Sequence, residues 1–455
     1  MSEPSAPPVT PAIGLVAAAP RQLGAAQSRH RLPGVSATVA GPEGVLWSGG
    51  IGLADVASQQ AATPDTQFRI GSITKTFTAV AILQLRDGGR LRLDDPVSAH
   101  VPEAGGSPVT LRHLLTHASG LQREPPGRVW ERPRMPSTEE FLRSLGDAEA
   151  VLEPDEHWHY SNLGFALLGE VVARVSGRPY TKVVEETLIQ PLDLARTSWA
   201  PEPPIATGYL VDPLTDGVEK EPVLELDGLA AAGQLWSTTD DLCRWGLFLL
   251  APDPDVLRPE TAEEMLRLRI MSDPDRWTQG WGLGLMLWRR GERFFAGHLG
   301  GMPGHRAALV VSRAERRAAA VLVNATAGGD VGSMGLELLQ LAIDRVPAVP
   351  IAWRPSGPPP AQLLDVVGSW WSEGVEHRFV HRDGRLEARP AATPDAEPSV
   401  FAPLLADVWR TVSGPERGER LELEREAGGT VAHLHWATYR FDRSPIPFGA
   451  TAPPP

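Results

Sequence analysis

Lysine is almost missing from this sequence. Of its 43 basic residues only Lys75, Lys182 and Lys220 are lysines, and the remainder are arginines. Either residue serves for surface charge, but a lysine whose pKa is lowered can release its proton, whereas an arginine effectively cannot. Lys75 lies in the stretch FRIGSITKTFTAVAILQL (68–85). The residues around it must show whether its amine has a chemical task.

Cysteine is nearly absent as well, since Cys243 is the only one. A single cysteine rules out an internal disulfide and a cluster of thiolate metal ligands. Cys243 lies in the apolar, helical-looking stretch DDLCRWGLFLL (240–250). We therefore expect a packed thiol and not a nucleophile.

Positive charge and long apolar runs are also lacking. A net charge of −13 and a pI near 5.5 exclude the basic face that a nucleic-acid-binding protein needs, and give no attraction to anionic membranes. No apolar run approaches the length of a membrane span. The N-terminus has no basic leader, because its first arginine is Arg21 and prolines interrupt its apolar part. We expect a cytoplasmic protein without a nucleic-acid or membrane partner.

A chain of 455 residues allows more than one domain, and proline-rich stretches mark the boundaries. Asp383-Gly384 and Gly428-Gly429 each separate two extended runs near the C-terminus, which is typical of β-hairpins. The expected divisions are a disordered N-terminus (1–12), a main domain (13–346), a proline-rich linker (347–362), a small all-β domain (363–445) and a disordered tail (446–455).

The main domain begins and ends with strand patterns and has helical patterns between them. Two strands are predicted around a turn at 41–44, and three more between 281 and 326. The stretch 161–177 predicts a helix that stops at Gly177, and 237–250 predicts another with Ser237 as its N-cap. This order favours an α/β sandwich in which both ends of the domain build one sheet.

Ser72 and Lys75 form an S-x-x-K pair at the expected start of a helix. Three residues apart, their side chains share one face, one turn apart. Gly71 lets the chain turn sharply, and the helix N-terminus favours negative charge on the serine oxygen. A desolvated, partly neutral amine could then take the hydroxyl proton.

Two further motifs could complete such a site. Tyr160 and Asn162, a Y-x-N pair at a helix entrance, could supply a proton relay and a group that holds Lys75 and a substrate carbonyl. His298-Leu299-Gly300-Gly301 lies on or beside a core strand. Its glycines would let a substrate lie against the backbone, and the N–H of Gly301 could complete an oxyanion hole with that of Ser72.

In this order and spacing, S-x-x-K, Y-x-N and H-x-G resemble the serine β-lactamase and penicillin-binding family, specifically its class C, esterase and D-aminopeptidase branch. The resemblance covers about 12 to 345. It implies an antiparallel sheet flanked by helices, with an inserted helical subdomain, and no cofactor or metal. It also implies that Ser72 forms an acyl-enzyme and that Lys75 and Tyr160 share the acid and base work.

The third motif departs from the Lys-Thr/Ser-Gly of penicillin-recognising members. His298 is expected to be only partly charged near neutrality, and Leu299 brings no hydroxyl to hold a substrate carboxylate. We therefore expect hydrolysis of a small ester, an amide or a short D-amino-acid peptide. The all-β domain resembles the lipocalin-like barrels of some members, which shape the site or assemble oligomers, so a homo-oligomer stays open.

Other readings of the sequence have less support. His113 and His117 have the spacing of a zinc helix, but Leu114 stands where the catalytic glutamate is required. No G-x-S-x-G of an α/β-hydrolase is present. A β-lactamase, an acyltransferase with the same acyl-enzyme, and an inactive binding protein on the same fold remain open.

Overall fold

The computed structural model describes residues 13–106, 108–132, 134–327, 329–347, 355 and 357–446. The chain divides into two compact units, Met1–Ala348 and Val349–Pro455, and each is described by itself. The expected disordered N-terminus and all but the first residue of the expected tail lie outside the described residues. Most of the segment 348–356, from the expected linker, lies outside them too.

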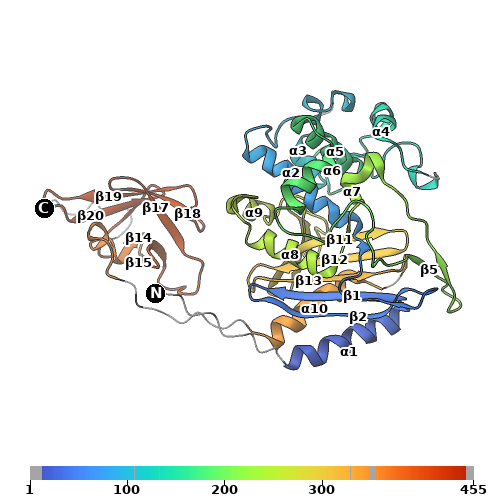
Figure 1. Ribbon diagram of the computed structural model, residues 1–455. Helices are drawn as coiled ribbons and strands as arrows, with labels where there is room; N and C mark the ends of the chain where they lie inside the picture. The colour runs from blue at the N-terminus through green and yellow to red at the C-terminus, as the bar shows by residue number, and fades with distance from the viewer. Residues whose placement is uncertain are drawn as a thin grey trace. The chain divides into compact units, whose positions relative to one another are not determined.

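A nine-stranded antiparallel sheet forms the centre of the first unit (Figure 1). β1 lies in its interior, and Val35 of β1 stands opposite Val323 of β13. The prediction that both ends of the domain build one sheet is therefore confirmed. In spatial order the strands are β3 (Gln60–Ala61), β2 (Gly44–Asp55), β1 (Gly34–Gly41), β13 (Arg317–Val323), β12 (His305–Ser312), β11 (Arg293–Met302), β10 (Met286–Arg290), β9 (Gln279–Trp281) and β8 (Ile270–Met271).

Helices cover both faces of this sheet. α1 (Ile13–His30) and α10 (Val331–Arg345) pack on one face, while α8 (Thr239–Leu250) packs on the other. No helix in the described part of the chain is long and apolar enough to cross a membrane. Between β3 and β9 the described residues form the short turn η1 (Gly71–Ile73) and further α-helices: α2 (Thr74–Asp87), α3 (Leu111–Thr116), α4 (Thr138–Ser144), α5 (Asn162–Ser176), α6 (Tyr180–Val184), α7 (Ala230–Gly233) and α9 (Pro259–Met265).

The ends of α5 and α8 can be compared with the predicted caps. Ser161 caps α5 by accepting the N–H of Gly164, and Gly177 ends it with a positive φ of 71°, as predicted. The predicted cap of α8 was wrong by one residue. Thr238 is the N-cap, because Ser237 is paired in the short ribbon of β4 (Phe68–Arg69) and β7 (Trp236–Ser237).

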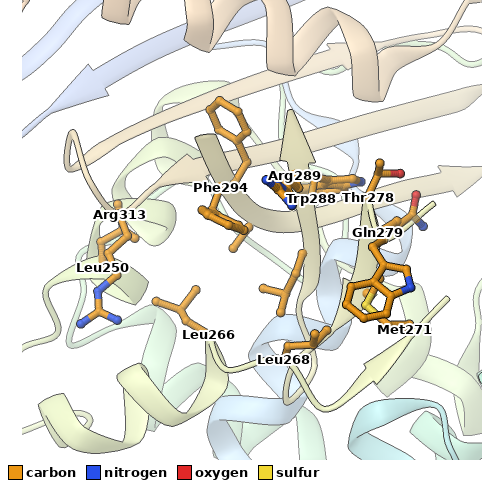
Figure 2. A pocket seen from close by; sticks show the side chains of 15 residues that line it. Leu250, Leu266, Leu268, Met271, Thr278, Gln279, Trp288, Arg289, Phe294 and Arg313 are labelled. Atoms are coloured by element: carbon orange, nitrogen blue, oxygen red, sulfur yellow. The ribbon is translucent and has the colours of Figure 1, made fainter. Parts of the chain in front are cut away.

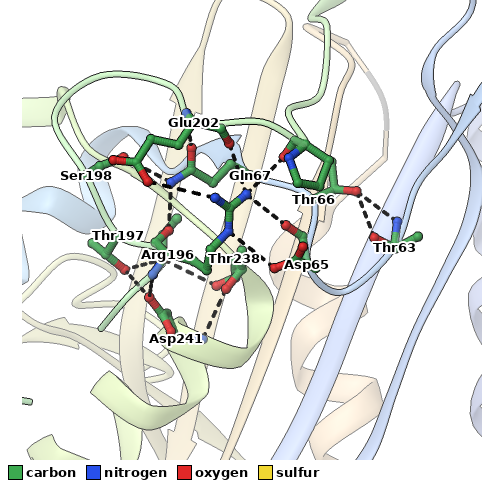
Figure 3. Close-up of polar contacts among 12 residues, drawn as sticks. Thr63, Asp65, Thr66, Gln67, Arg196, Thr197, Ser198, Glu202, Thr238 and Asp241 are labelled. Carbon is green, nitrogen blue, oxygen red and sulfur yellow. Dashed lines mark hydrogen bonds and ion pairs between the residues drawn. The ribbon is translucent and has the colours of Figure 1, made fainter. Parts of the chain in front are cut away.

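A polar network holds the loop before β5 (Tyr209–Val211) and β6 (Val218–Lys220) against the strand that leads to Ser72 (Figure 3). Gln67, directly before β4, donates to the carbonyl oxygen of Arg196 at 2.8 Å. The Arg196 guanidinium donates to the carbonyl oxygen of Glu202 at 2.9 Å. Asp241 of α8 accepts the backbone N–H of Arg196 at 2.8 Å. The loop is therefore hydrogen-bonded both to the residue before β4 and to α8.

The second unit is one antiparallel sheet of eight strands in consecutive order. Backbone hydrogen bonds between Trp371 and Asp442 join its first and last strands and nearly close a barrel. Both predicted hairpins are confirmed, and Trp370 is buried in the core. The strands are β14 (Gly368–Ser372), β15 (Val375–Arg382), β16 (Arg385–Pro390), β17 (Ser399–Leu405), β18 (Val408–Ser413), β19 (Arg420–Arg425), β20 (Val431–Trp436) and β21 (Tyr439–Phe441).

Candidate active site

Ser72 lies in the turn η1, which runs directly into α2. The backbone of β11 passes against this turn at two glycine contacts. Gly71 has a φ of +51°, and a Cβ there would come within 2.6 Å of the nitrogen of Gly301. A Cβ on Gly300 would come within 1.9 Å of the Ile70 oxygen. Only glycine allows this approach, which brings the third motif to the half-buried serine.

Lys75 lies one turn after Ser72 and is fully buried. Its amine contacts three oxygens. The Nζ atom lies 3.1 Å from Ser72 Oγ, 2.7 Å from Asn162 Oδ1 and 2.6 Å from the carbonyl oxygen of Ala232. The structure therefore brings the first two predicted motifs together around one nitrogen.

The charge of this amine is strongly disfavoured by its surroundings. Burial, with a smaller contribution from the nearby cation of Arg123, lowers the pKa of Lys75 from 10.5 to about 7. The carboxylate of Glu124 acts in the opposite direction. Near neutral pH a large share of the molecules therefore carries a neutral amine at this position.

Tyr160 completes the group around the serine. Its hydroxyl is hydrogen-bonded to Ser72, and burial raises the pKa of Tyr160 well above its usual range, so the hydroxyl keeps its proton. Its ring stacks on that of His117 with centroids 4.3 Å apart. The Nδ1 of His117 accepts the N–H of Ser161 at 3.1 Å, which fixes the stacking ring.

His298 differs from the expectation of partial charge. Burial, with repulsion from Lys75, lowers its pKa to about 3, so the ring is neutral near neutral pH. Its Nδ1 donates to the carbonyl oxygen of Leu299 at 2.6 Å. The other ring nitrogen, Nε2, is buried and has no partner among the described residues. The third motif thus offers a neutral acceptor, and no cation, near Tyr160.

Two residues of the site were not found from the sequence. Glu124 accepts a hydrogen bond from Asn162 Nδ2 at 2.6 Å, and its second oxygen, Oε2, is buried without a partner among the residues described. The guanidinium of Arg123 lies over the Tyr160 ring at 4.8 Å. The carbonyl oxygen of Arg123 accepts the N–H of Asn162 at 2.7 Å. The sequence signal for these two site residues was the adjacent pair of opposite charges, Arg123-Glu124, shortly after Gly120-Leu121. Such charge pairs are too common to indicate an active site.

The two histidines with zinc-helix spacing have separate partners. His113 accepts the backbone N–H of Thr110 in a capping box and contacts the Asp155 carboxylate at 3.1 Å. His117 stacks on Tyr160 instead. Within the described residues no group of three or more His, Cys, Asp or Glu side chains could hold a metal ion.

Comparison with known families agrees with this arrangement. A model described as Beta-lactamase matches residues 16–342, well over half of the chain. The chain belongs to the β-lactamase family. The resemblance drawn from the three motifs is thereby confirmed. A second model, a domain of unknown function (DUF7586), matches residues 359–443 of this β-lactamase-family protein.

Individual relatives extend the comparison. A D-stereospecific amidohydrolase from Streptomyces sp. is 30% identical with a TM-score of 0.61, over 72% of this chain and 98% of that one. An octameric penicillin-binding protein homologue from Pyrococcus abyssi, 24% identical with a TM-score of 0.64 over 94% and 99% of the two chains, shares the fold. The D-alanyl-D-alanine-carboxypeptidase/endopeptidase AmpH of Escherichia coli (strain K12) is 35% identical over 199 residues. That match covers 42% of this chain and only half of AmpH.

Proposed function

We propose that this protein is a serine hydrolase that cleaves a small ester or amide through an acyl-enzyme on Ser72. One observation carries the proposal: the buried amine of Lys75, with a pKa of about 7, lies 3.1 Å from Ser72 Oγ. A base titrating near the working pH and within hydrogen-bond reach of a hydroxyl is what activates a serine nucleophile.

The contacts of Lys75 suggest the path of the proton. Its two shorter hydrogen bonds, to Asn162 and Ala232, can use both N–H groups of a neutral amine. The nitrogen lone pair is then left for the third direction, toward Ser72. Ser72 Oγ attacks the substrate carbonyl carbon as Lys75 takes the hydroxyl proton. The Tyr160 hydroxyl protonates the leaving oxygen or nitrogen and regains a proton from Lys75.

The carbonyl oxygen needs donors as the tetrahedral intermediate forms. We assign this role to the backbone N–H groups of Ser72 and Gly301, since β11 passes against the serine turn and Gly301 is exposed. Gly300 lets the substrate approach the strand. Water then attacks the acyl carbon as the neutral Lys75 amine takes one of its protons, and that proton passes to Ser72 Oγ as the acid is released, which restores the starting state.

Glu124 favours a substrate that carries an amine near the scissile bond. The Oε2 of Glu124 is buried without a partner among the described residues, so it can accept from a substrate ammonium. His298 is neutral and cannot hold a substrate carboxylate as a cation would. A D-amino-acid amide or peptide fits these charges, and the names of the amidohydrolase and AmpH relatives support this class.

Intact-mass spectrometry tests the acyl-enzyme. After incubation with a fluorophosphonate or a p-nitrophenyl ester, the wild-type protein should gain one adduct, and Ser72→Ala should gain none. Ester turnover that survives in Ser72→Ala would reject the mechanism. A lasting or hydrolysed β-lactam adduct would favour a β-lactamase, and no adduct with any reagent would favour an inactive binding protein.

The amine preference has its own test. The ratio of kcat/KM for D-alanine p-nitroanilide to that for its N-acetyl derivative should fall about 10- to 100-fold in Glu124→Gln, the effect of losing one charged hydrogen bond. Glu131→Gln is the matched control, because Glu131 is exposed in the same region. An unchanged ratio would remove the amine from the proposal but leave the acyl-enzyme intact.

The sequence also left a homo-oligomer open as a partner. Sedimentation of the full chain tests whether it forms one.

A further inference from the structure

An apolar pocket of about 310 Å³ opens beside β9, β10 and β11, where these strands face α8 and the segment after α9 (Figure 2). Leu266 and Leu268 lie across the open space from Phe294. Leu250 and Leu287 extend the apolar lining. Its volume and lining lie within the range of small-molecule sites in proteins. None of its 15 lining residues belongs to the three catalytic motifs, so the proposed hydrolysis does not account for it.

The rim of the pocket exposes large apolar side chains to water, which forgoes the free energy that their burial would supply. Trp277 is 71% exposed, Phe294 68% and Leu268 55%. Neighbouring exposed groups of this size mark a binding site more often than single exposed residues do.

Trp277 is also held in an uncommon conformation. Its φ is +55°, in the left-handed region that non-glycine residues seldom adopt. The carboxylate of Asp273 fixes the loop around it by accepting the N–H of Gln279 at 2.8 Å and that of Thr278 at 3.1 Å. Such strain persists where the surroundings impose it, typically beside ligands.

The charges on the lining have one sign. Arg289 and Arg313 line the pocket, and no acidic residue does so among the described residues, although the chain as a whole carries −13. Arg313 is 3.2 Å from Glu263 and Arg289 is 3.5 Å from Glu292, but these four side chains are all about half exposed or more, so both pairs are weak. The Arg289 guanidinium lies over the ring of Phe294 at 5.8 Å. A cation therefore stands next to apolar surface at the rim.

We propose that this pocket binds an amphipathic carboxylate, a molecule with an unbranched apolar chain and one anionic head. The chain lies among the leucines and Phe294, and the carboxylate pairs with a rim guanidinium of Arg289 or Arg313. Apolar burial supplies most of the affinity, and the arginines select the anionic head over a neutral or cationic one.

Isothermal titration calorimetry of the full chain tests the proposal with decanoate, decanol and decylammonium. Decanoate should bind at one site per chain, and decylammonium should bind at least about tenfold more weakly. Leu268→Glu places a carboxylate at the rim without disturbing the core, because the side chain is 55% exposed. It should weaken decanoate about tenfold or more while ester turnover stays unchanged. The double variant Arg289→Gln, Arg313→Gln should reduce decanoate to the affinity of decanol.

The control is Leu214→Glu, at a leucine that is 91% exposed and does not line the pocket; it should leave binding unchanged. A dissociation constant for decanoate above about 1 mM would overturn the proposal. Binding that ignores Leu268→Glu would overturn it as well. If Leu268→Glu instead changes the sedimentation of the chain and decanoate does not bind, the face is an interface between copies, and the proposed ligand is wrong.

Discussion

The pH dependence of ester hydrolysis should follow the ionisation of Lys75, and two neighbouring charges should move it in opposite directions. Lys75 must be neutral to accept the proton of Ser72, so the acylation rate should rise as the pH passes through about 7. Glu124 stabilises the ammonium form and Arg123 destabilises it. Glu124→Gln should therefore shift the rise to lower pH, and Arg123→Gln should shift it to higher pH.

The size of the first shift follows from the contacts. Two hydrogen bonds in series, 2.7 Å from Lys75 to Asn162 and 2.6 Å from Asn162 to Glu124, join the two charges through one amide group. At a separation on the order of 7 Å and an effective dielectric constant of about 20, the attraction is about 2 kcal/mol, or about 1.5 pKa units. The Arg123 side chain is 63% exposed. Screening by solvent should therefore limit the change that Arg123→Gln causes in the pKa of Lys75 to about half a unit.

The assay is pre-steady-state acylation by a neutral p-nitrophenyl ester between pH 5 and pH 10. An ester without an amine separates the effect on Lys75 from the proposed recognition of a substrate ammonium by Glu124. Unmoved profiles, or a shift of both variants in the same direction, would show that the titrating group is not Lys75 and would refute the reasoning.

Three further changes test the same site. Lys75→Arg keeps a cation but loses the base, so steady-state ester turnover should fall about 10²- to 10⁴-fold; turnover within tenfold of wild type would contradict the base role. His298→Lys should raise kcat/KM for amides with a carboxylate relative to neutral esters, and an unchanged ratio would argue against this position in substrate selection. Lys75→Met removes an amine that is charged in the unfolded chain up to about pH 10 but neutral in the native one above about 7. Between about pH 7 and pH 10 the unfolded wild-type chain therefore binds one more proton than the native one. In urea titrations the unfolding free energy of wild type should rise, relative to that of Lys75→Met, by about 1.4 kcal/mol for each unit by which the pH is raised. If the two plots of unfolding free energy against pH ran parallel, the lowered pKa would be contradicted.

What the sequence predicted well rests on local chemistry. Ser72 and Lys75 are three residues apart on adjoining helical turns, so their meeting needs no long-range information. The hairpin turns and the glycine that ends α5 likewise act through their own backbone. The order of the elements was enough to predict a shared sheet. The first and last strands of the domain, with only helical patterns between them, find their partners in each other, and β1 does lie beside β13.

What it missed depends on burial and on distant contacts. The segment α1 contains Pro20 in its interior, and a proline there argues against a helix; packing against α10 and β2 favours the helix nonetheless. His298 was expected to carry partial charge, because nothing in its own motif reveals that both Lys75 and complete burial oppose protonation. Glu124 is held at the site by Asn162, which donates its side-chain amide to Glu124 and its backbone N–H to the carbonyl oxygen of Arg123; neither contact can be read from the sequence.

The geometry also explains why a chain that otherwise uses arginine keeps an amine at position 75. The buried nitrogen there has three oxygen partners within 3.1 Å, which match the three N–H bonds of an ammonium or the two N–H bonds and lone pair of a neutral amine. A guanidinium would bring five fixed donors and no acceptor. Its excess donors would be buried without partners, which costs free energy, and it could not take the proton of Ser72. Packing and proton transfer therefore select the same side chain.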